Sequence, residues 1–458
     1  MKHILLTILA ILLVGQLMAQ TYSGVSESQY AGYLGTTINP ANIVNPNYKA
    51  DIHLLSFNTA LVNDYLKINI DSAVNGTGNF LDRFEDQNPN STSANLGFDF
   101  EMNWLGGMFA INKKIGVGFG IKSRALVSAK GFNKDLIRMS ASGLEDSTYY
   151  GQSFTDEYTS LTAASWNEYS LYFGAEIMNT GAHKVTVGGG FNLLQSNGSF
   201  HLYMEDLAYE FQDEDTIARV QGTVTYGGNF SDIPASLGTT FVPFAPGNTA
   251  NSNFGFSMDV GATYEFTPGG SGKYKLKAGV AFHDIGFLAA TPDDRVSNRI
   301  TFDLQDIAVN NFDGIQDFDG INNLIVQDTV AYNYDQYNRE LMMQAPTRMN
   351  IFVDYNVVKG FYVSFLSDVA LYRQNNGHRL VGINSFELTP RYDFKWFGVA
   401  FPINYVQYSG FGIGVGLRVG PFYAGTSNLI TAFGAGKEWS SLNAYMGFRI
   451  PLFKKKAK

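Results

Sequence analysis

The 458-residue sequence contains no cysteine. This absence excludes a disulfide framework, a cysteine nucleophile and the lipid-modified cysteine of a lipoprotein. A long chain without a single cysteine is typical of an exported bacterial protein.

Charged residues are also scarce, at 16% of the chain, whereas roughly 25% is usual in soluble domains. The formal net charge is −9, and the only cationic run is the Lys454-Lys455-Lys456 tail. Nucleic-acid binding requires a concentrated basic surface. We therefore expect no nucleic-acid partner.

Long apolar runs are missing after the N-terminus. No later segment approaches the ~18 consecutive apolar residues of a membrane-spanning helix, so helical spans are excluded. Apolar residues are nevertheless abundant: 45% of the chain is hydrophobic and 14% is aromatic, beside 48 glycines. Abundant but dispersed apolar residues are typical of alternating β-strands.

Residues 1–19 predict a cleaved signal peptide. Lys2 and His3 precede an almost wholly apolar stretch from Ile4 to Val14, which is followed by Gly15, Gln16 and Leu17-Met18-Ala19. The alternative, a membrane anchor, is disfavoured because the apolar stretch is short for the ~30 Å hydrocarbon layer. We expect cleavage after Ala19 and a mature chain that begins at Gln20.

The clearest alternation in the sequence runs from Gly410 to Gly420. Glycines and Arg418 alternate with the apolar residues Phe411, Ile413, Val415, Leu417 and Val419. A period of two indicates a β-strand with one apolar face and one small or charged face. Similar runs recur at 95–104, 115–122, 168–177, 185–193, 254–266, 276–282, 349–357, 361–369, 380–392, 396–405, 422–426 and 443–453.

No helical pattern remains to cover these apolar faces, so the recurrence predicts an all-β transmembrane antiparallel up-and-down β-barrel with lipid outside. We expect about fourteen strands, within a range of roughly twelve to sixteen. Residues 20–49 precede the barrel domain, 50–458, and the segment 51–70 predicts an irregular hairpin. Long polar connections near 130–165, 228–251 and 286–345 are expected on the extracellular side.

Charged residues on the small face of these strands should point into the lumen, because an Arg or Lys facing lipid at the midplane costs about 2–4 kcal/mol. They would form either a salt-bridge lattice that fills the interior or a polar conduit. Mixed charge without a ring of one sign favours the lattice. The predicted lumen-facing charges are Asp99, Glu101, Lys122, Arg124, Glu168, Glu176, Asp259, Glu265, Lys275, Lys277, Asp354, Glu387, Arg391, Arg418 and Arg449.

The four tryptophans lie near predicted strand ends, at Trp104, Trp166, Trp396 and Trp439. Tryptophan favours the membrane interface, where both its apolar ring and its N–H group are accommodated. We therefore predict that they contribute to aromatic girdles, with ordinary core packing as the alternative.

Three short stretches carry a family resemblance. Gly412 to Gly425, Tyr445 to Pro451 and Ala345 to Met349 resemble strands of a Bacteroidota outer-membrane barrel family of unknown function. Asn39-Pro40-Ala41 is similar to the Asn-Pro-Ala element near the start of FadL-type fatty-acid transport barrels. The resemblance implies a FadL-like barrel in the bacterial outer membrane, with Asn39, Pro40 and Ala41 in an N-terminal plug.

The sequence contains no recognisable catalytic, cofactor or metal motif. Its six histidines are scattered, without the H-E-x-x-H or G-x-S-x-G patterns of hydrolases. Gly116, Gly118 and Gly120 lie within a strand and open no helix, so they do not form a dinucleotide-binding loop. The acidic hexads at 311–322 lack the end ligands of a calcium loop. We predict a protein that is not an enzyme and has no cofactor.

Two functions remain open. The first is passive passage of hydrophobic or small molecules through a porin-like or FadL-like barrel. The second is a structural subunit of a larger outer-membrane assembly for secretion or surface proteins. The expected partners are outer-membrane lipid, a hydrophobic small molecule and other outer-membrane proteins. Architecture alone does not decide between these functions.

Overall fold

The computed structural model describes residues 22–69, 84–86, 90–142, 147–228, 253–270, 273–290, 298–308, 332–336, 341–372, 379–429, 438–439 and 441–454. Among them, 3-10 helices lie at Gly32–Thr37, Pro40–Ile43, Ser147–Tyr149 and Pro268–Gly270, and helix α3 at Lys134–Ser142. No helix in these ranges is long and apolar enough to span a membrane.

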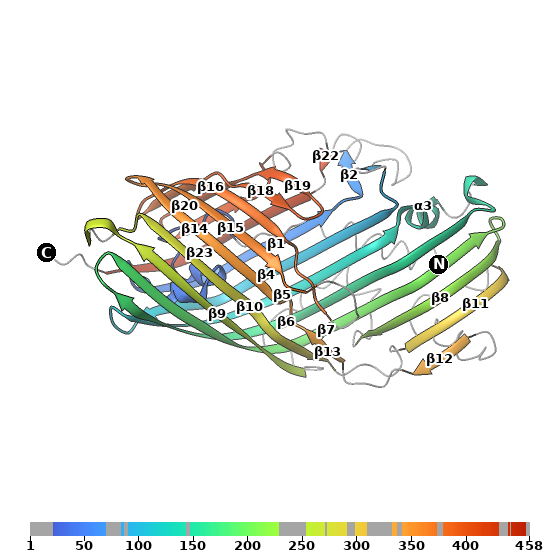
Figure 1. Cartoon of the computed structure of the whole chain (residues 1–458), viewed down its shortest axis with the longest axis horizontal. Helices are drawn as coiled ribbons and strands as arrows, with labels where there is room; N and C mark the ends of the chain where they lie inside the picture. The colour runs from blue at the N-terminus through green and yellow to red at the C-terminus, as the bar shows by residue number, and fades with distance from the viewer. Residues whose placement is uncertain are drawn as a thin grey trace.

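One large sheet contains most of the strands (Figure 1). Its members are β1 (Tyr48–Asn63), β4 (Ser93–Ala110), β5 (Ile115–Asn133), β6 (Ser153–Asn179), β7 (His183–Phe211), β8 (Thr216–Gly228), β9 (Asn253–Phe266), β10 (Leu276–Ala290), β11 (Asn298–Ala308), β12 (Tyr332–Gln336), β13 (Leu341–Gln344), β14 (Arg348–Val358), β15 (Phe361–Ala370), β16 (Ser385–Asp393), β17 (Phe397–Ala400), β18 (Ile403–Val406), β19 (Gly410–Ile413), β20 (Val415–Val419), β21 (Phe422–Thr426) and β23 (Ser441–Phe453). A small sheet contains β2 (Leu66–Asn69), β3 (Phe84–Asp86) and β22 (Glu438–Trp439).

The large sheet closes on itself, because β1 pairs with β4 on one side and with the last strand, β23, on the other. The pair β17 and β18 occupies one position in the ring, since both pair with β16, and β19 and β20 occupy the next. The result is a closed antiparallel barrel of 14 strands. The predicted fold class and strand number are confirmed.

The stretch from Gly410 to Gly420 alternates as predicted. Phe411 is 84% exposed on the outside, whereas Arg418 is 2% exposed. The stretch is nevertheless divided into β19 and β20 at Gly414, whose N–H donates to the Pro402 carbonyl at 2.7 Å. Proline has no N–H to return a hydrogen bond, so the ladder is interrupted there.

The outer surface of the barrel is apolar. Large hydrophobic side chains at alternate positions of β6, β7 and β9 are exposed, among them Leu171 at 66%, Phe173 at 56% and Phe254 at 55%. A continuous apolar exterior on a closed barrel needs hydrocarbon as its solvent, and closure leaves no unpaired strand edge there. The chain is therefore a membrane-spanning barrel.

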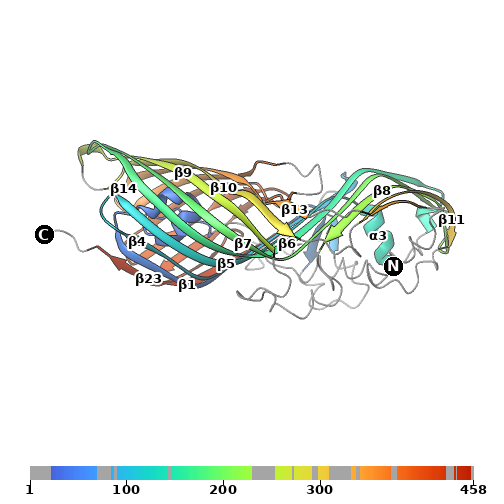
Figure 2. The same ribbon diagram turned by 90° about the horizontal axis from the view of Figure 1, so that it is seen from below.

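The two ends of the barrel differ. At one end of the barrel, β1 begins, β23 ends, and short turns lie near residues 111–114, 180–182, 359–360 and 420–421. The strands that precede the long connections end at the other. Beyond that other end, β6, β7, β8, β11 and β12 continue as a curved sheet, which we call the extension (Figure 2).

The extension corrects several loop predictions. Nearly half of 130–165 is strand, because β5 runs to Asn133 and β6 begins at Ser153. Strands β11, β12 and β13 lie within the predicted 286–345 loop, whereas 229–251 lies outside the described residues. The expected 51–70 hairpin is also wrong, because β1 passes unbroken to Asn63. Alternation marks apolar faces, so it misses strands whose two faces are both polar or both buried.

Candidate functional site in the barrel interior

Residues 22–47, which we call the N-terminal segment, lie inside the barrel (Figure 2). Tyr22, Leu34 and Asn39 are all 0% exposed. Ser23 hydrogen-bonds to Glu387 on β16, and Asn39 to carbonyls on β9 and β10. Arg449 on β23 donates to the Tyr30 carbonyl, and β23 and β10 lie on opposite sides of the ring, so the segment contacts opposite sides of the barrel.

Asn39 and Pro40 explain the local fold of this segment. The Asn39 side-chain oxygen accepts the Ala41 N–H at 2.9 Å and caps the 3-10 helix that begins at Pro40. The Asn39 amide donates to the carbonyls of Ala262 at 3.0 Å and Val280 at 2.9 Å. Proline suits the first helical position because its missing N–H has no intrahelical partner there. Asn39, Pro40 and Ala41 together fix the segment against β9 and β10.

Glycines in the barrel wall provide the space that the segment occupies. A Cβ atom at Gly116 would lie 2.3 Å from the Ile43 carbonyl oxygen, and one at Gly118 would lie 2.6 Å from the Ile43 side chain. A Cβ at Gly188 would lie 2.5 Å from the Ala41 nitrogen. The alternating glycines therefore allow close backbone approach rather than forming a phosphate loop.

The substitution Gly188→Val should displace the N-terminal segment, because its side chain would overlap the backbone of Pro40 and Ala41. Overpacking of about 1–3 kcal/mol would raise the population of the displaced segment roughly tenfold or more. Limited proteolysis of the segment in detergent measures this. The control is Gly189→Val, where a Cβ would meet only the Asp259 carbonyl, at 3.4 Å. Equal proteolysis of both variants would contradict the prediction.

A network of charged side chains lies beside the segment. Lys122 contacts Glu168 at 3.0 Å and Glu101 at 3.6 Å. Arg124 lies 2.9 Å from Asp284 and 3.4 Å from Glu168. Strands β4, β5, β6 and β10 supply these groups, so their charges meet across the interior.

Three further ion pairs lie in the polar interior. Arg391 contacts Asp354 at 2.6 Å, and Arg418 contacts Asp393 at 2.7 Å. Arg449 contacts Asp51 at 3.3 Å and also donates to the carbonyls of Tyr30 and Ala31. The barrel wall thus holds the N-terminal segment through charge-assisted hydrogen bonds.

The structure places the remaining charges of the predicted lumen set as follows. Glu265 contacts Lys184 and Lys277, while the Lys277 ammonium donates to Asn42 of the segment at 2.7 Å. Asp259 is 4% exposed and lies 3.6 Å from His283. Three members differ from the rest: Asp99 is half-buried beside a cavity, Glu176 accepts a hydrogen bond from Asn179 at a turn, and Lys275 donates to the carbonyls of Asn356 and Val357.

The alternation did not identify Asp284, Arg348 and Asp368 as members of the network. Asp284 lies in a β-bulge between Phe282 and Ile285, with a φ of 57°. A bulge shifts the inward and outward positions by one residue. The positive φ leaves no mark in a sequence, although Asp tolerates it better than most residues.

A cavity of about 50 Å³ separates the segment from the outer end of the interior. Ile38, Leu126 and Leu366 contribute apolar atoms, and Asp99 and Arg348 contribute charges. This volume has room for a few water molecules but not for a continuous aqueous pore.

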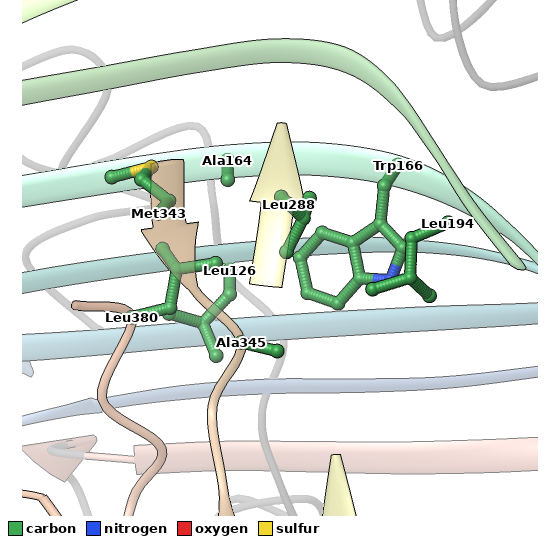
Figure 3. Close-up of a cluster of buried hydrophobic side chains, with 8 residues drawn as sticks. All are labelled: Leu126, Ala164, Trp166, Leu194, Leu288, Met343, Ala345 and Leu380. Atoms are coloured by element: carbon green, nitrogen blue, oxygen red, sulfur yellow. The ribbon is translucent and has the colours of Figure 1, made fainter. Parts of the chain in front are cut away.

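Next to this cavity, on the side toward the extension, lies an apolar cluster inside the barrel (Figure 3). It consists of Leu126, Ala164, Trp166, Leu194, Leu288, Met343, Ala345 and Leu380. These side chains come from β5, β6, β7, β10 and β13, and from the connections that follow β13 and β15. An apolar layer therefore covers the charged network.

Trp166 is a correction to the girdle prediction. It is 1% exposed within the apolar cluster, and the Arg124 guanidinium lies 4.8 Å from its ring centroid. Trp166 and Glu168 are two residues apart on β6, so both side chains point inward. The girdle prediction did not consider this alternation. Trp396 is 54% exposed and Trp104 is half-buried, with its N–H on Ser123. The Trp439 side chain lies outside the described part.

The described residues contain no group of three or more His, Cys, Asp or Glu side chains that could hold a metal ion. The acidic hexads at 311–322 lie outside the described residues. The described interior thus contains a polar lattice, an apolar cluster and a seated segment.

A closed ladder, an apolar exterior and an occupied polar interior define the class: a membrane-spanning β-barrel with a filled lumen. The chain belongs to a family of unknown function, DUF5723, whose model matches residues 40–427. This confirms the expected membership of a barrel family of unknown function. No curated protein is similar to it in sequence.

Several solved structures are similar in fold. The toluene transporter TodX of P. putida shares 10% identity with a TM-score of 0.40, over 93% of this chain and 95% of its own. The toluene transporter TbuX of Ralstonia pickettii shares 12% identity with a TM-score of 0.39, over 94% and 98%. A FadL homologue of Pseudomonas aeruginosa shares 10% identity with a TM-score of 0.32, over 95% and 98%.

Proposed function

We propose that this protein is an outer-membrane channel for the passive passage of small hydrophobic molecules, with the N-terminal segment as its plug. The observation that carries the proposal is the apolar cluster. A barrel interior normally exposes polar side chains, yet eight apolar residues gather inside this one. Such a surface favours an apolar guest over water.

The location follows from two features. The apolar exterior requires a bilayer, and the predicted signal peptide at residues 1–19 would export the chain. Single-chain bacterial barrels of this kind lie in the outer membrane. We place the short turns and the end of β23 on the periplasmic side and the extension on the outside.

Passage requires no energy source. A hydrophobic molecule enters from the outer end and binds at the apolar cluster, where burial of its surface is favourable. Further movement requires the N-terminal segment to shift. Hydrogen bonds such as those of Arg449 to Tyr30 and Ala31 can break and re-form, so the plug acts as a gate rather than a permanent seal.

Uptake of the hydrophobic fluorophore N-phenylnaphthylamine tests the proposal in vesicles with lipopolysaccharide in the outer leaflet. The substitution Leu380→Asn places a polar amide in the apolar cluster and should lower uptake about tenfold, since burying an unpaired amide costs about 1–3 kcal/mol. The control is Leu371→Asn, because Leu371 is 42% exposed and outside the cluster. Uptake no faster than in protein-free vesicles would refute the channel.

The extension favours a second candidate function, a structural subunit of a larger outer-membrane assembly. Strands β6 and β7 contain 27 and 29 residues, whereas about 9–11 suffice to cross a membrane. The extension presents ion pairs on its surface, such as Arg219 with Asp303 at 2.9 Å. Stoichiometric copurification of another outer-membrane protein, together with a sealed lumen, would support this function.

A further inference from the structure

Two acidic side chains face each other between the N-terminal segment and the barrel wall. Glu27 belongs to the segment and is 5% exposed, and Glu387 belongs to β16 and is 4% exposed. Ser23, four residues before Glu27 in the segment, donates its hydroxyl to Glu387, and the two carboxyl groups interact as neighbours. Two neighbouring ionised carboxylates in a buried site would repel strongly.

The surrounding hydrogen bonds distinguish the two carboxyl groups. One Glu387 oxygen accepts from the Ser23 hydroxyl and the other from the Thr389 hydroxyl. Neither Glu27 oxygen accepts a well-aligned hydrogen bond from a described residue, and the nearby Gly24 amide is shared with Glu387. These hydroxyl groups stabilise Glu387 as an anion. Glu27 is placed to be a neutral carboxylic acid that donates its O–H to Glu387.

The nearest positive charge does not compensate the second carboxylate. Arg391 lies close to Glu27, but it already pairs with Asp354 at 2.6 Å and donates to Ser364 at 2.9 Å. From β23, Tyr445 also faces the pair, and its hydroxyl donates to the Ser23 carbonyl. The charges of Arg391 and Asp354 cancel, so a shared proton is needed to remove the repulsion between the two glutamates.

We infer that Glu27 and Glu387 share one proton, and that this proton fastens the N-terminal segment to the barrel wall. The inference rests on the proposed role of the segment as a plug and adds its regulation. Loss of the proton to hydroxide leaves two buried carboxylates in contact. Their repulsion favours release of the segment, which returns Glu27 to water.

The direction of the pH effect follows from Glu27. Burial and then the facing Glu387 carboxylate raise the pKa of Glu27 well above its ordinary value. A group whose pKa is higher in the seated state stabilises that state fully at pH values below its ordinary pKa. The stabilisation is lost as the pH rises through the seated pKa. Alkaline conditions should therefore release the segment and acidic conditions should hold it.

Thiol labelling directly measures whether the N-terminal segment is seated in the barrel, because the chain contains no native cysteine that would react. Ala31→Cys places a thiol at a position that is 2% exposed in the seated segment. Its maleimide labelling rate is divided by that of Lys113→Cys, at an exposed turn residue, to correct for thiol ionisation. Between pH 5 and pH 9 this ratio should rise at least about tenfold, the change that one unit of pKa shift produces.

The substitution Glu27→Gln should make the ratio low and independent of pH, because a neutral amide donates to Glu387 at every pH. Glu387→Gln is the second test, since the introduced amide can donate to an ionised Glu27 and again remove the repulsion. Glu205→Gln in the extension is the matched control and should keep the wild-type rise, because Glu205 contacts Arg299 at 3.8 Å on the surface.

Three results would overturn the inference: a flat ratio in the wild type, an unchanged rise in Glu27→Gln, or a ratio that responds to a calcium chelator at fixed pH in the wild type alone. The last would show that the pair holds a divalent cation rather than a proton. The labelling ratio does not depend on transport. If the channel proposal is wrong, dye uptake will not exceed that of protein-free vesicles. If the shared proton does not hold the segment, the labelling ratio will not depend on pH.

Discussion

Deleting residues 20–47 from the mature chain should convert a closed barrel into one that conducts ions in discrete steps across a planar bilayer. In the intact protein the segment contacts the wall on opposite sides, and the cavity beside it holds only about 50 Å³. Barrels of 8 strands are filled by their own side chains, whereas those of 16–18 leave an aqueous channel. A barrel of 14 strands therefore has room for a pore once its plug is removed.

The deletion ends before Tyr48 so that β1 and its pairing with β23 stay intact. Circular dichroism of the purified variant checks that the strands are retained. The full-length protein is the control, and it should be silent or open rarely. Silence in both forms would mean that the charged network and the apolar cluster seal the barrel by themselves. That result would contradict the plug and favour the structural role.

The sequence predicted the barrel because each apolar outer face repeats with a period of two. Phe411, Leu417 and Arg418 occupy the faces that the pattern gave them. The pattern could not predict the interior in the same way. Leu126, Trp166 and Leu194 are apolar at inward positions, and alternation treats every apolar residue as outward. The side chains that cover them, Met343 on β13 and Leu380, lie far away in the sequence.

The N-terminal segment shows a similar limit. The resemblance of Asn39-Pro40-Ala41 predicted that this segment is a plug. The glycines that line its path in the barrel were recognised only as residues of strands. That Gly116 and Gly188 accommodate Ile43 and Ala41 depends on how the segment folds back within the barrel. Such long-range packing has no local signal. Glu27 was overlooked for the same reason, because its partner Glu387 is 360 residues away and its burial requires the whole barrel.

The substitution Arg391→Met should destabilise the barrel strongly. Asp354 is 0% exposed, and its carboxylate accepts from Arg391 at 2.6 Å and from the Tyr274 hydroxyl at 2.6 Å. Removing the arginine leaves a buried, uncompensated charge, which costs about 3–5 kcal/mol. Equilibrium unfolding by urea in lipid vesicles measures the loss. The double variant Asp354→Asn with Arg391→Met should recover most of it, because the buried charge is gone.

The matched control is Arg219→Met in the extension. Arg219 also pairs with an aspartate, through a two-point contact with Asp303 at 3.0 and 2.9 Å, but both side chains are about half exposed, at 51% and 53%. Exposed pairs contribute only about 0–1 kcal/mol. Equal losses in the two single variants would show that water reaches Asp354, as a polar conduit requires. A large loss at Arg391 alone would identify the interior charges as a rigid lattice, so that movement of the N-terminal segment, rather than a pre-formed polar path, must open the barrel.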